Sequence, residues 1–589
     1  MERYDNFLKY LFPILAIGVA ILVYLPALNA PFVYDDGHSI YQNPAVLSTA
    51  GIRDFLRDPS LFSERREARM YRPLTLWSYS LNYRFAGFNM SLWHGFQFLF
   101  HTLNVLLVFL IVKKITSDSL VSFVPAVVFA VHPLCSETVI YQSARSSLIA
   151  TTMVLSAFYF HLSERGWQNT LSVLIFMLGL LAKESAIVFP VLAFLYDFTL
   201  NPRNKLKWKS YFLYCVVAVG YFALRRFLFE VETFHISSPV RPVSENLLNQ
   251  AGVLLFYLIK VLYPIGLSIE HNFSTTRGWF PVGVPLWRMP VFSVPVVALL
   301  LLFSFFFRKK FPLWTFVMGW WFITLAPESS FIPLVQLVNE RRTYLPLVGF
   351  CLTIALFLFK RNHKGYLLTQ VLAISMLFIL TFNRAKEWQR AETLWASAYR
   401  RAPDCATALH GIASAKLDKK ELRGAQKFYN MLTRNFPDYY KGYIGLGRTF
   451  VGMGDYEKAL KALERASSLF PYDDMIWTNL SDIYLKTGRI EQAYYSASKA
   501  VNMNPKAVQA WNNLAISLAR FARLQEGLNA IDKALELNPR YAVGHFNKGN
   551  ILQMLGRRED ALASYRRALE LEPDFNLARE ALSNLERHP

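Results

Sequence analysis

The stretch PKAVQAWNNLAISLARFARLQEGLNAIDKALELNP, residues 505–539, decides the fold of the C-terminal third of the chain. Its first and last prolines belong to a strict series, in which proline recurs every 34 residues at Pro403, Pro437, Pro471, Pro505, Pro539 and Pro573. Between the prolines, aromatic and small residues return at matching positions, such as Trp477 with Trp511. A fixed period of this length predicts a stack of helical hairpins that bury their apolar faces against one another.

The period and the residue pattern resemble the tetratricopeptide repeat, in which small residues let neighbouring helices pack and a proline ends the second helix. We expect five full repeats from residue 403 to 572, with a leading helix at 384–402 and a capping helix at 574–588. Such a stack presents a concave groove, so the repeats predict a surface that binds an extended peptide or a partner segment.

The preceding two thirds of the chain have the composition of a membrane protein. The 589 residues are 53% hydrophobic and only 18% charged, and the mean hydropathy is +0.23. Twelve apolar runs long enough to enter a bilayer lie between residues 11 and 382, and none follows. The first run resembles a signal peptide, but Pro31 disfavours cleavage and eleven more runs follow, so we interpret it as a retained helix.

The charge and the cysteines exclude several other classes of protein. The net charge of +21 divides into +13 over residues 1–382 and +8 over residues 383–589. Much of it lies in short runs between apolar stretches, as membrane-flanking charge does, which argues against nucleic-acid binding. The four cysteines have neither the spacing of a zinc site nor that of a disulfide framework.

Lys and Arg in the short loops predict the topology, because they mark the cytoplasmic side. We expect a hairpin at Lys183-Glu184, since a single helix over 169–199 would hold two charges at its centre. The run at 247–263 is then interfacial or re-entrant, which leaves about eleven spans. The N-terminus is predicted to be cytoplasmic, and the long loops and the repeats to lie outside. The predicted domains are residues 1–382 and 383–589.

Charged and polar motifs gather on the predicted outer face. The pair Asp35-Asp36 follows the first span, and adjacent carboxylates there are costly unless they are used or solvated. The other motifs on this face are Arg72, His132 with Glu137 and Arg145, Lys183 with Glu184, and Glu340-Arg341 with Tyr344. Each motif alone also has a structural interpretation as a cap or an ion pair.

These motifs together resemble a known family. An acidic pair after the first helix, a large first outer loop and about eleven spans are similar to the GT-C class of membrane glycosyltransferases. The order of the motifs, followed by tetratricopeptide repeats, resembles the transmembrane and tetratricopeptide-repeat (TMTC) O-mannosyltransferases over essentially the whole chain. The motifs are FVYDD at 32–36, YRPLT at 71–75, SYSLNY at 78–83, HPLCSE at 132–137, LLAKESAI at 180–187 and ERRTYLP at 340–346.

The resemblance implies an enzyme that moves mannose or another hexose from a polyprenyl phosphate to Ser or Thr hydroxyls of exported proteins. It implies Asp35 or Asp36 as general base, with Glu137 as a second acid or orienting group. Cations suit the phosphate of the donor, and the expected ones are Arg72, Arg145, Lys183 and Arg341. His132, Glu184, Glu340 and Tyr344 are expected to support them. The repeat side chains expected to hold a protein acceptor are Tyr443, Trp477, Trp511 and Asn547.

The chain has no phosphate loop and no metal-ligand motif, which disfavours a nucleotide-sugar donor and gives no indication of a required metal. Two alternatives stay open: a glycosyltransferase for a cell-surface glycolipid or polysaccharide, and a membrane scaffold without enzymatic activity. The expected location is the bacterial inner membrane with periplasmic catalytic loops, or the endoplasmic reticulum with lumenal loops if the chain is eukaryotic.

Overall fold

The computed structural model describes residues 2–48, 50–63, 70–163, 165–201, 206–227, 241–271, 273, 284–329, 333–334, 336–360 and 367–587. These residues form helices and connecting segments, and none of them lies in a β-strand. The predicted all-helical class is thereby confirmed. The chain divides into two compact units, one made of Met1–Ile40, Ala50–Phe62 and Arg69–Cys405, the other of Tyr41–Thr49, Ser63–Ala68 and Ala406–Pro589.

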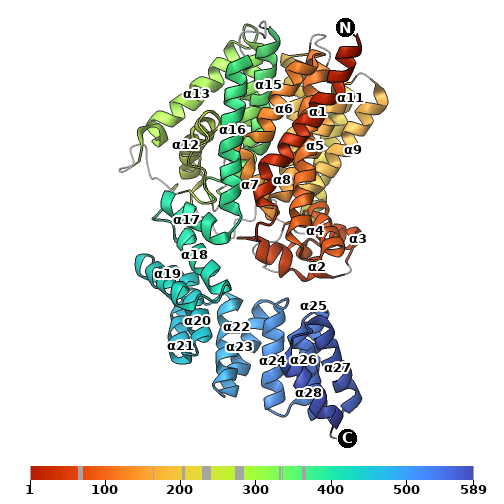
Figure 1. The fold of residues 1–589 in the computed structure, drawn as a ribbon. Helices are drawn as coiled ribbons and strands as arrows, with labels where there is room; N and C mark the ends of the chain where they lie inside the picture. The colour runs from red at the N-terminus through yellow and green to blue at the C-terminus, as the bar shows by residue number, and fades with distance from the viewer. Residues whose placement is uncertain are drawn as a thin grey trace. The chain divides into compact units, whose positions relative to one another are not determined.

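Each predicted apolar run coincides with one helix of the first unit (Figure 1). These long helices are α1 (Glu2–Tyr24), α5 (Met90–Thr116), α6 (Ser119–Val131), α8 (Arg145–His161), α9 (Gly166–Ala182), α10 (Phe189–Thr199), α11 (Trp208–Phe227), α12 (Val243–Leu262), α13 (Pro290–Phe306), α14 (Pro312–Leu325), α15 (Tyr344–Lys360) and α16 (Leu367–Trp388). The shorter elements are α3 (Ile52–Arg57), α4 (Pro73–Ala86), α7 (Ser136–Ile140) and α17 (Ala391–Arg401), with α2 (Pro44–Leu47) in the second unit.

Within the described ranges, three helical segments are long and apolar enough to cross a membrane: Tyr10–Ala27, Met90–Thr116 and Leu368–Trp388. A fourth candidate is the pair Ser119–Val131 and Pro133–Ile140, which is bent by 54°. Shorter apolar helices lie at Gly166–Ala182, Pro290–Phe306 and Pro312–Leu325. The chain therefore has apolar helices compatible with a membrane, whereas the number of about eleven spans and their orientation stay predictions.

The connection between α6 and α8 forms a buried platform. His132 ends α6, and its Nδ1 accepts a hydrogen bond from the backbone of Leu134 (3.3 Å). The 3-10 turn Pro133–Cys135, helix α7 and the 3-10 turn Gln142–Ala144 then follow, and almost every residue from 132 to 145 is buried. The platform therefore places polar side chains such as Glu137 and Gln142 in a buried setting.

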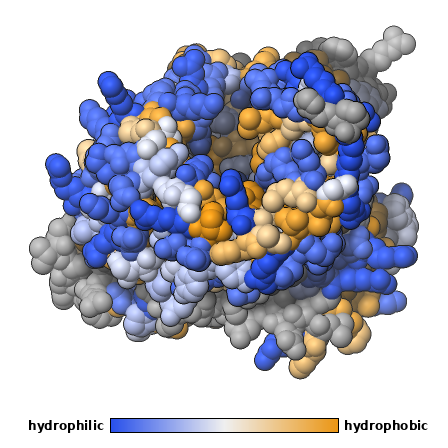
Figure 2. Space-filling model, turned by 90° about the horizontal axis from the view of Figure 1, so that it is seen from below, coloured by the Kyte–Doolittle hydropathy of each residue, from blue (hydrophilic) through white to orange (hydrophobic). Residues whose placement is uncertain are grey.

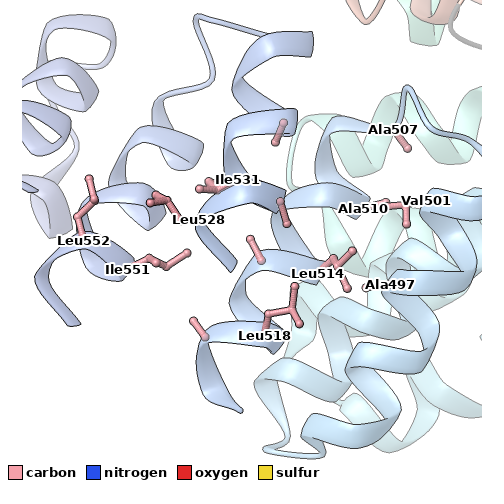
Figure 3. Close-up of a cluster of buried hydrophobic side chains, with 14 of the residues drawn as sticks. Ala497, Val501, Ala507, Ala510, Leu514, Leu518, Leu528, Ile531, Ile551 and Leu552 are labelled. Carbon is pink, nitrogen blue, oxygen red and sulfur yellow. The ribbon is translucent and has the colours of Figure 1, made fainter. Parts of the chain in front are cut away.

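The repeats form successive helical hairpins in the described part of the second unit. They are α18 (Ala406–Asp418) with α19 (Leu422–Asn435), α20 (Tyr440–Met453) with α21 (Tyr456–Leu469), α22 (Asp474–Lys486) with α23 (Ile490–Met503), α24 (Val508–Arg520) with α25 (Leu524–Leu537), and α26 (Ala542–Met554) with α27 (Arg558–Leu571), followed by α28 (Asn576–Arg587). Figure 3 shows their apolar core, where Leu514 and Leu518 of α24 lie between residues of α23 and α25. Helix α16 continues through residue 382, so the division into domains at that residue stays a prediction.

The turn inside each hairpin has a fixed backbone requirement. Residues at one repeat position all have a positive φ: Lys420 (60°), Gly454 (78°), Gly488 (74°), Ala522 (59°) and Gly556 (73°). Only glycine adopts this left-handed conformation without strain, which explains why glycine occupies three of the five positions.

Figure 2 shows hydrophilic side chains over most of the face that it presents, with apolar side chains gathered in patches.

Candidate functional site

The two acidic residues after α1 occupy different environments. Asp36 is buried, with 1% of its surface exposed. Its Oδ2 accepts from the backbone N of Val33 (3.0 Å), and its Oδ1 accepts from the backbone N (2.8 Å) and the hydroxyl (2.6 Å) of Ser143. Burial raises the pKa of Asp36 to about 7, although these three donors oppose the rise. Asp36 therefore fastens the first loop to the platform.

Asp35 is the accessible member of the pair, with 40% of its side chain exposed. Its backbone N donates to the hydroxyl of Tyr141 (2.9 Å), and its Oδ1 lies 3.4 Å from Nε2 of His38. Partial burial alone would raise the pKa of Asp35, but the hydrogen bond to His38 and the charge of Arg341 bring it below its usual value. Asp35 thus presents an ionised carboxylate at the surface of the platform.

Arg341, whose charge acts on this carboxylate, is anchored in the platform. Its guanidinium lies over the ring of Tyr141 (5.3 Å), and its Nη1 lies 3.2 Å from Oε1 of Glu137. Glu137 is 1% exposed, and its Oε2 has no hydrogen-bond partner among the described residues. Because the side chain of Arg341 is 24% exposed, it is held from inside and remains accessible from outside.

Two further ion-pair groups lie at the turn after α9. Arg72 makes a bidentate contact with Glu184, from Nε to Oε2 (3.1 Å) and from Nη2 to Oε1 (2.6 Å). Lys183 donates to the hydroxyl of Ser147 (3.0 Å) and pairs with Oε1 of Glu328. The other oxygen of Glu328 lies 3.5 Å from Nε of Arg342. One carboxylate therefore holds two cations next to each other.

Lys183 and Arg342 line a small cavity of about 30 Å³. Its charged lining consists of Lys183, Arg341, Arg342 and Glu328. The other residues that line it are Ser147, Thr151, Ser185, Thr324 and Tyr344, together with the apolar Ala150, Val154, Ala186, Leu345 and Pro346. Cations beside apolar side chains are the groups that bind a phosphate attached to an apolar chain. The cavity has about the volume of one water molecule, so a phosphate enters it only if a lining side chain moves.

Arg145, another cation predicted for the donor phosphate, lies in a separate hydrogen-bond network. Its guanidinium is completely buried and donates to Gln97 (3.2 Å), Asn82 (2.9 Å) and Gln142 (2.8 Å), and it lies over the rings of Tyr79 and Trp93 at 5.0 Å each. These contacts join α4, α5 and the platform, so its place fits a structural support. Arg145 is not among the residues that line the cavity.

Three of the four predicted supporting residues, His132, Glu340 and Tyr344, are buried, whereas 36% of the Glu184 side chain is exposed. His132 Nε2 lies 3.1 Å from the carbonyl of Val261. Glu340 accepts at Oε1 from the backbone of Ser268 (2.7 Å) and contacts His271 (2.7 Å). The hydroxyl of Tyr344 contacts His101 (2.7 Å) and Asn104 (3.2 Å). Each of these residues fixes neighbouring elements, and Glu184 does so by pairing with Arg72.

The aromatic residues proposed for the repeat groove have contacts within the repeats. Nε1 of Trp477 donates to the carbonyl of Pro471, and Nε1 of Trp511 donates to that of Pro505, both at 2.9 Å. Nδ2 of Asn547 donates to Oδ1 of Asn512 (2.8 Å). Tyr443 lies in α20 and is half-buried. Acceptor binding by these four residues stays a prediction.

Several residues of the site were missed by the sequence reasoning. Glu328 ends an apolar run and belongs to no motif that would mark it as a site residue. Ser143 lies in the platform segment, and no other feature of the sequence marks it as a site residue. Arg342 lies within the motif ERRTYLP, beside the predicted Arg341, and Tyr141 follows the motif HPLCSE. No group of three or more His, Cys, Asp or Glu side chains suited to a metal ion occurs in the described parts of the chain.

Comparisons with known proteins agree with the motifs. Tetratricopeptide-repeat family profiles match residues 542–575 and 450–515. A protein O-mannosyl-transferase of Caenorhabditis elegans, F38B6.6, is 24% identical over 440 residues, which is 72% of this chain and 63% of that protein. The protein O-mannosyl-transferase TMTC3 of Homo sapiens is 26% identical over 513 residues, 78% of this chain and 55% of that protein.

A further relative is the human protein O-mannosyl-transferase TMTC1, which is 24% identical over 74% of this chain and 56% of its own length. The chain thus spans between 55% and 63% of the length of these relatives. Among solved structures, the tetratricopeptide-repeat protein YrrB, described with an unusual peptide-binding site, matches 32% of this chain and 97% of its own at 23% identity, with a TM-score of 0.27. The resemblance to the TMTC type that the motifs indicate is confirmed by the named relatives.

Proposed function

We propose, with this family resemblance as the premise, that the chain is a membrane glycosyltransferase that moves mannose or another hexose from a polyprenyl-phosphate donor to Ser or Thr hydroxyls of proteins. The observation that carries the proposal is the cavity lined by Lys183, Arg341 and Arg342 beside apolar side chains. A lipid-linked phosphate has this combination of an anion and an apolar chain, whereas a nucleotide-sugar does not.

In this proposal Asp35 is the general base. A Ser or Thr hydroxyl has a pKa far above 7, so a positioned carboxylate assists by accepting its proton as the sugar passes through an oxocarbenium-like transition state. The side chain of Asp35 is exposed enough to contact an acceptor. The carboxylate of Asp36 instead accepts hydrogen bonds from the backbone of Val33 and from the backbone and hydroxyl of Ser143. Attack on the face opposite the phosphate would invert the anomeric centre.

The phosphate needs cations, because it leaves with the electron pair of the broken bond. Lys183, Arg342 and Arg341 are proposed to hold it, and Arg341 also lies next to Tyr141, which contacts the backbone of Asp35. Arg341 thereby connects the proposed donor site to the proposed base, and Glu137 orients Arg341 from inside. Arg72 acts in this proposal through Glu184 at the turn that carries Lys183.

A scaffold without activity would not need these charges. Burying a charge is costly unless it is paired, and replacing a buried ion pair by apolar residues is often neutral or stabilising. Arg341, Glu137, Lys183, Glu328 and Arg342 nevertheless gather at one place in a unit made mostly of apolar helices. Their cost favours a function that uses them.

The direct test is transfer by the purified full chain in detergent. Radiolabelled polyprenyl-phosphate mannose is offered together with a Ser/Thr-containing peptide, and GDP-mannose with the same peptide serves as the control donor. We expect label on the peptide from the lipid-linked donor alone. Transfer to a glycolipid but to no protein would move the function to the surface-polysaccharide alternative, and transfer from GDP-mannose would contradict the proposed donor.

A further inference from the structure

Glu328 is the carboxylate among the described residues that line the cavity. It lies just after α14, and 22% of its side chain is exposed. Its Oε1 pairs with Lys183, and its Oε2 lies 3.5 Å from Nε of Arg342. The side chains of both cations are largely buried, with 11% and 7% exposed. Each oxygen of Glu328 thus contacts one of the two cations.

The carboxylate is charged in this setting. Burial alone would raise the pKa of Glu328, but the charges of Lys183 and Arg342 bring it below its usual value. Glu328 is an ion-pair partner of both Lys183 and Arg342. A ligand with its own negative charge competes with Glu328 for the same cations.

We infer that Glu328 is an internal counter-ion that the donor phosphate displaces from Lys183 and Arg342, and that its charge promotes release of the phosphate product. The inference rests on the proposed function. In the proposed transfer, the bond between C1 of the sugar and the phosphate oxygen breaks, and its electron pair stays on the phosphate. The hydroxyl oxygen of the acceptor bonds to C1, and its proton goes to Asp35.

The charge of the phosphate changes during this step. The donor is a phosphodiester with one negative charge, whereas the product is a monoester that carries about −1.5 to −2 at pH 7. The carboxylate of Glu328 therefore repels the product more strongly than the donor, while the cations attract both. Glu328 lowers the affinity for the product relative to the donor and keeps the site from being blocked after transfer.

The experiment compares wild type with Glu328→Gln as full-length proteins in detergent. The probes are a short-chain polyprenyl monophosphate, whose binding is measured directly by calorimetry, and the corresponding polyprenyl-phosphate mannose, whose KM is measured. We expect the variant to bind the monophosphate about 10-fold more tightly, because one like-charge repulsion in a partly buried site is removed. The KM for the donor should fall by a smaller factor, and product inhibition should become visible in progress curves.

Glu387→Gln is the matched control. Glu387 is also partly exposed, at 26%, and it also bridges two cations, Arg384 and Arg401, but it does not line the cavity. This variant should leave the affinities for both probes at their wild-type values. Glu328→Asp keeps the charge, so it should keep the wild-type ratio of product affinity to donor affinity even if both affinities change.

Equal affinity of wild type and Glu328→Gln for the monophosphate, or weaker binding by the variant at an unchanged melting temperature, would overturn the inference. If Glu328→Gln does not fold, Glu328→Asp decides, because a changed ratio of product to donor affinity in that variant also overturns it. Absence of any turnover by wild type contradicts the proposed function alone, since binding of the monophosphate is measured without turnover.

Discussion

At the scale of single residues, the acidic pair divides its work. Asp36 is enclosed and accepts three hydrogen bonds, whereas Asp35 is accessible and lies near a cation. The sequence predicted the pair but left open which member acts as base, because both residues follow the same helix. The distinction depends on Ser143 and Tyr141, which lie more than 100 residues away in the chain. No local pattern contains that information.

The buried carboxyl of Asp36 predicts a pH dependence of stability. Its pKa is about 7 in the folded protein and 3.8 in its ordinary state, so between these values the folded protein binds more protons than the unfolded chain. Stability contributed by Asp36 therefore decreases as the pH rises from about 4 to 7. We expect the melting temperature of wild type to fall over this window more steeply than that of Asp36→Asn, measured by thermal unfolding in detergent. Parallel curves for the two proteins would contradict this prediction.

Arg341 allows a second prediction at this scale. Arg341→Lys keeps the charge but loses the planar group that lies over Tyr141 and reaches Glu137. We expect transfer to fall by about 10- to 100-fold through kcat, because orientation of the group at the reacting phosphate is lost. Arg342→Lys is the comparison variant. Arg342 also donates hydrogen bonds to the carbonyls of Leu337 and Gln336, so this variant should lose thermal stability as well. Wild-type kcat in Arg341→Lys would remove this residue from the site.

At the scale of the elements, the repeats were predictable and the platform was not. The 34-residue period of proline fixed the hairpins because each hairpin repeats one local pattern. The twelve apolar runs likewise predicted the positions of helices. The platform at 132–145 breaks into short turns, and its shape follows from contacts with the first loop and with Arg341. Such contacts join distant segments, so sequence periodicity does not report them.

The left-handed position of the hairpins gives a prediction for Ala522. Its φ of 59° is strained for a residue with a Cβ atom, and three equivalent positions hold glycine. Ala522→Gly should stabilise the repeats by about 0.5–1 kcal/mol, because relief of this strain exceeds the entropy that glycine adds to the unfolded chain. The matched change Gly488→Ala should destabilise the repeats, because the backbone there has a φ of 74°. No neighbouring atom obstructs the added methyl group, so the loss of stability reports the backbone strain alone. Thermal unfolding of the full chain measures both, and a lower melting temperature for Ala522→Gly would contradict the explanation.

The hydrogen bonds that Trp477 and Trp511 make within their own repeats argue against their predicted role in acceptor binding. Trp511→Phe removes the hydrogen bond to the carbonyl of Pro505 and should cost about 1 kcal/mol. The KM for a protein acceptor should stay at its wild-type value, because the indole is engaged within its own repeat. An increase in this KM at unchanged stability would return Trp511 to the acceptor site.

At the scale of the whole molecule, the positive-inside pattern makes a topology prediction. Lys207 should face the cytoplasm, while Gly37 and Arg558 should face outward, because this arrangement satisfies the basic short loops. Single cysteines at these three positions, in a chain whose four native cysteines are replaced, are labelled in intact cells with an impermeant thiol reagent. Labelling at 207, or protection at 558, would contradict the eleven-span arrangement.

The central claim is that Asp35 is the base of a transfer reaction from a lipid-linked sugar, and one measurement tests it most directly. Transfer of mannose from polyprenyl-phosphate mannose to a Ser/Thr peptide is followed for wild type and Asp35→Asn at equal concentrations of folded protein. The claim predicts a loss in kcat of about 100- to 10,000-fold, as for a removed general base, with unchanged donor binding and melting temperature. Transfer by Asp35→Asn at the wild-type rate would contradict it.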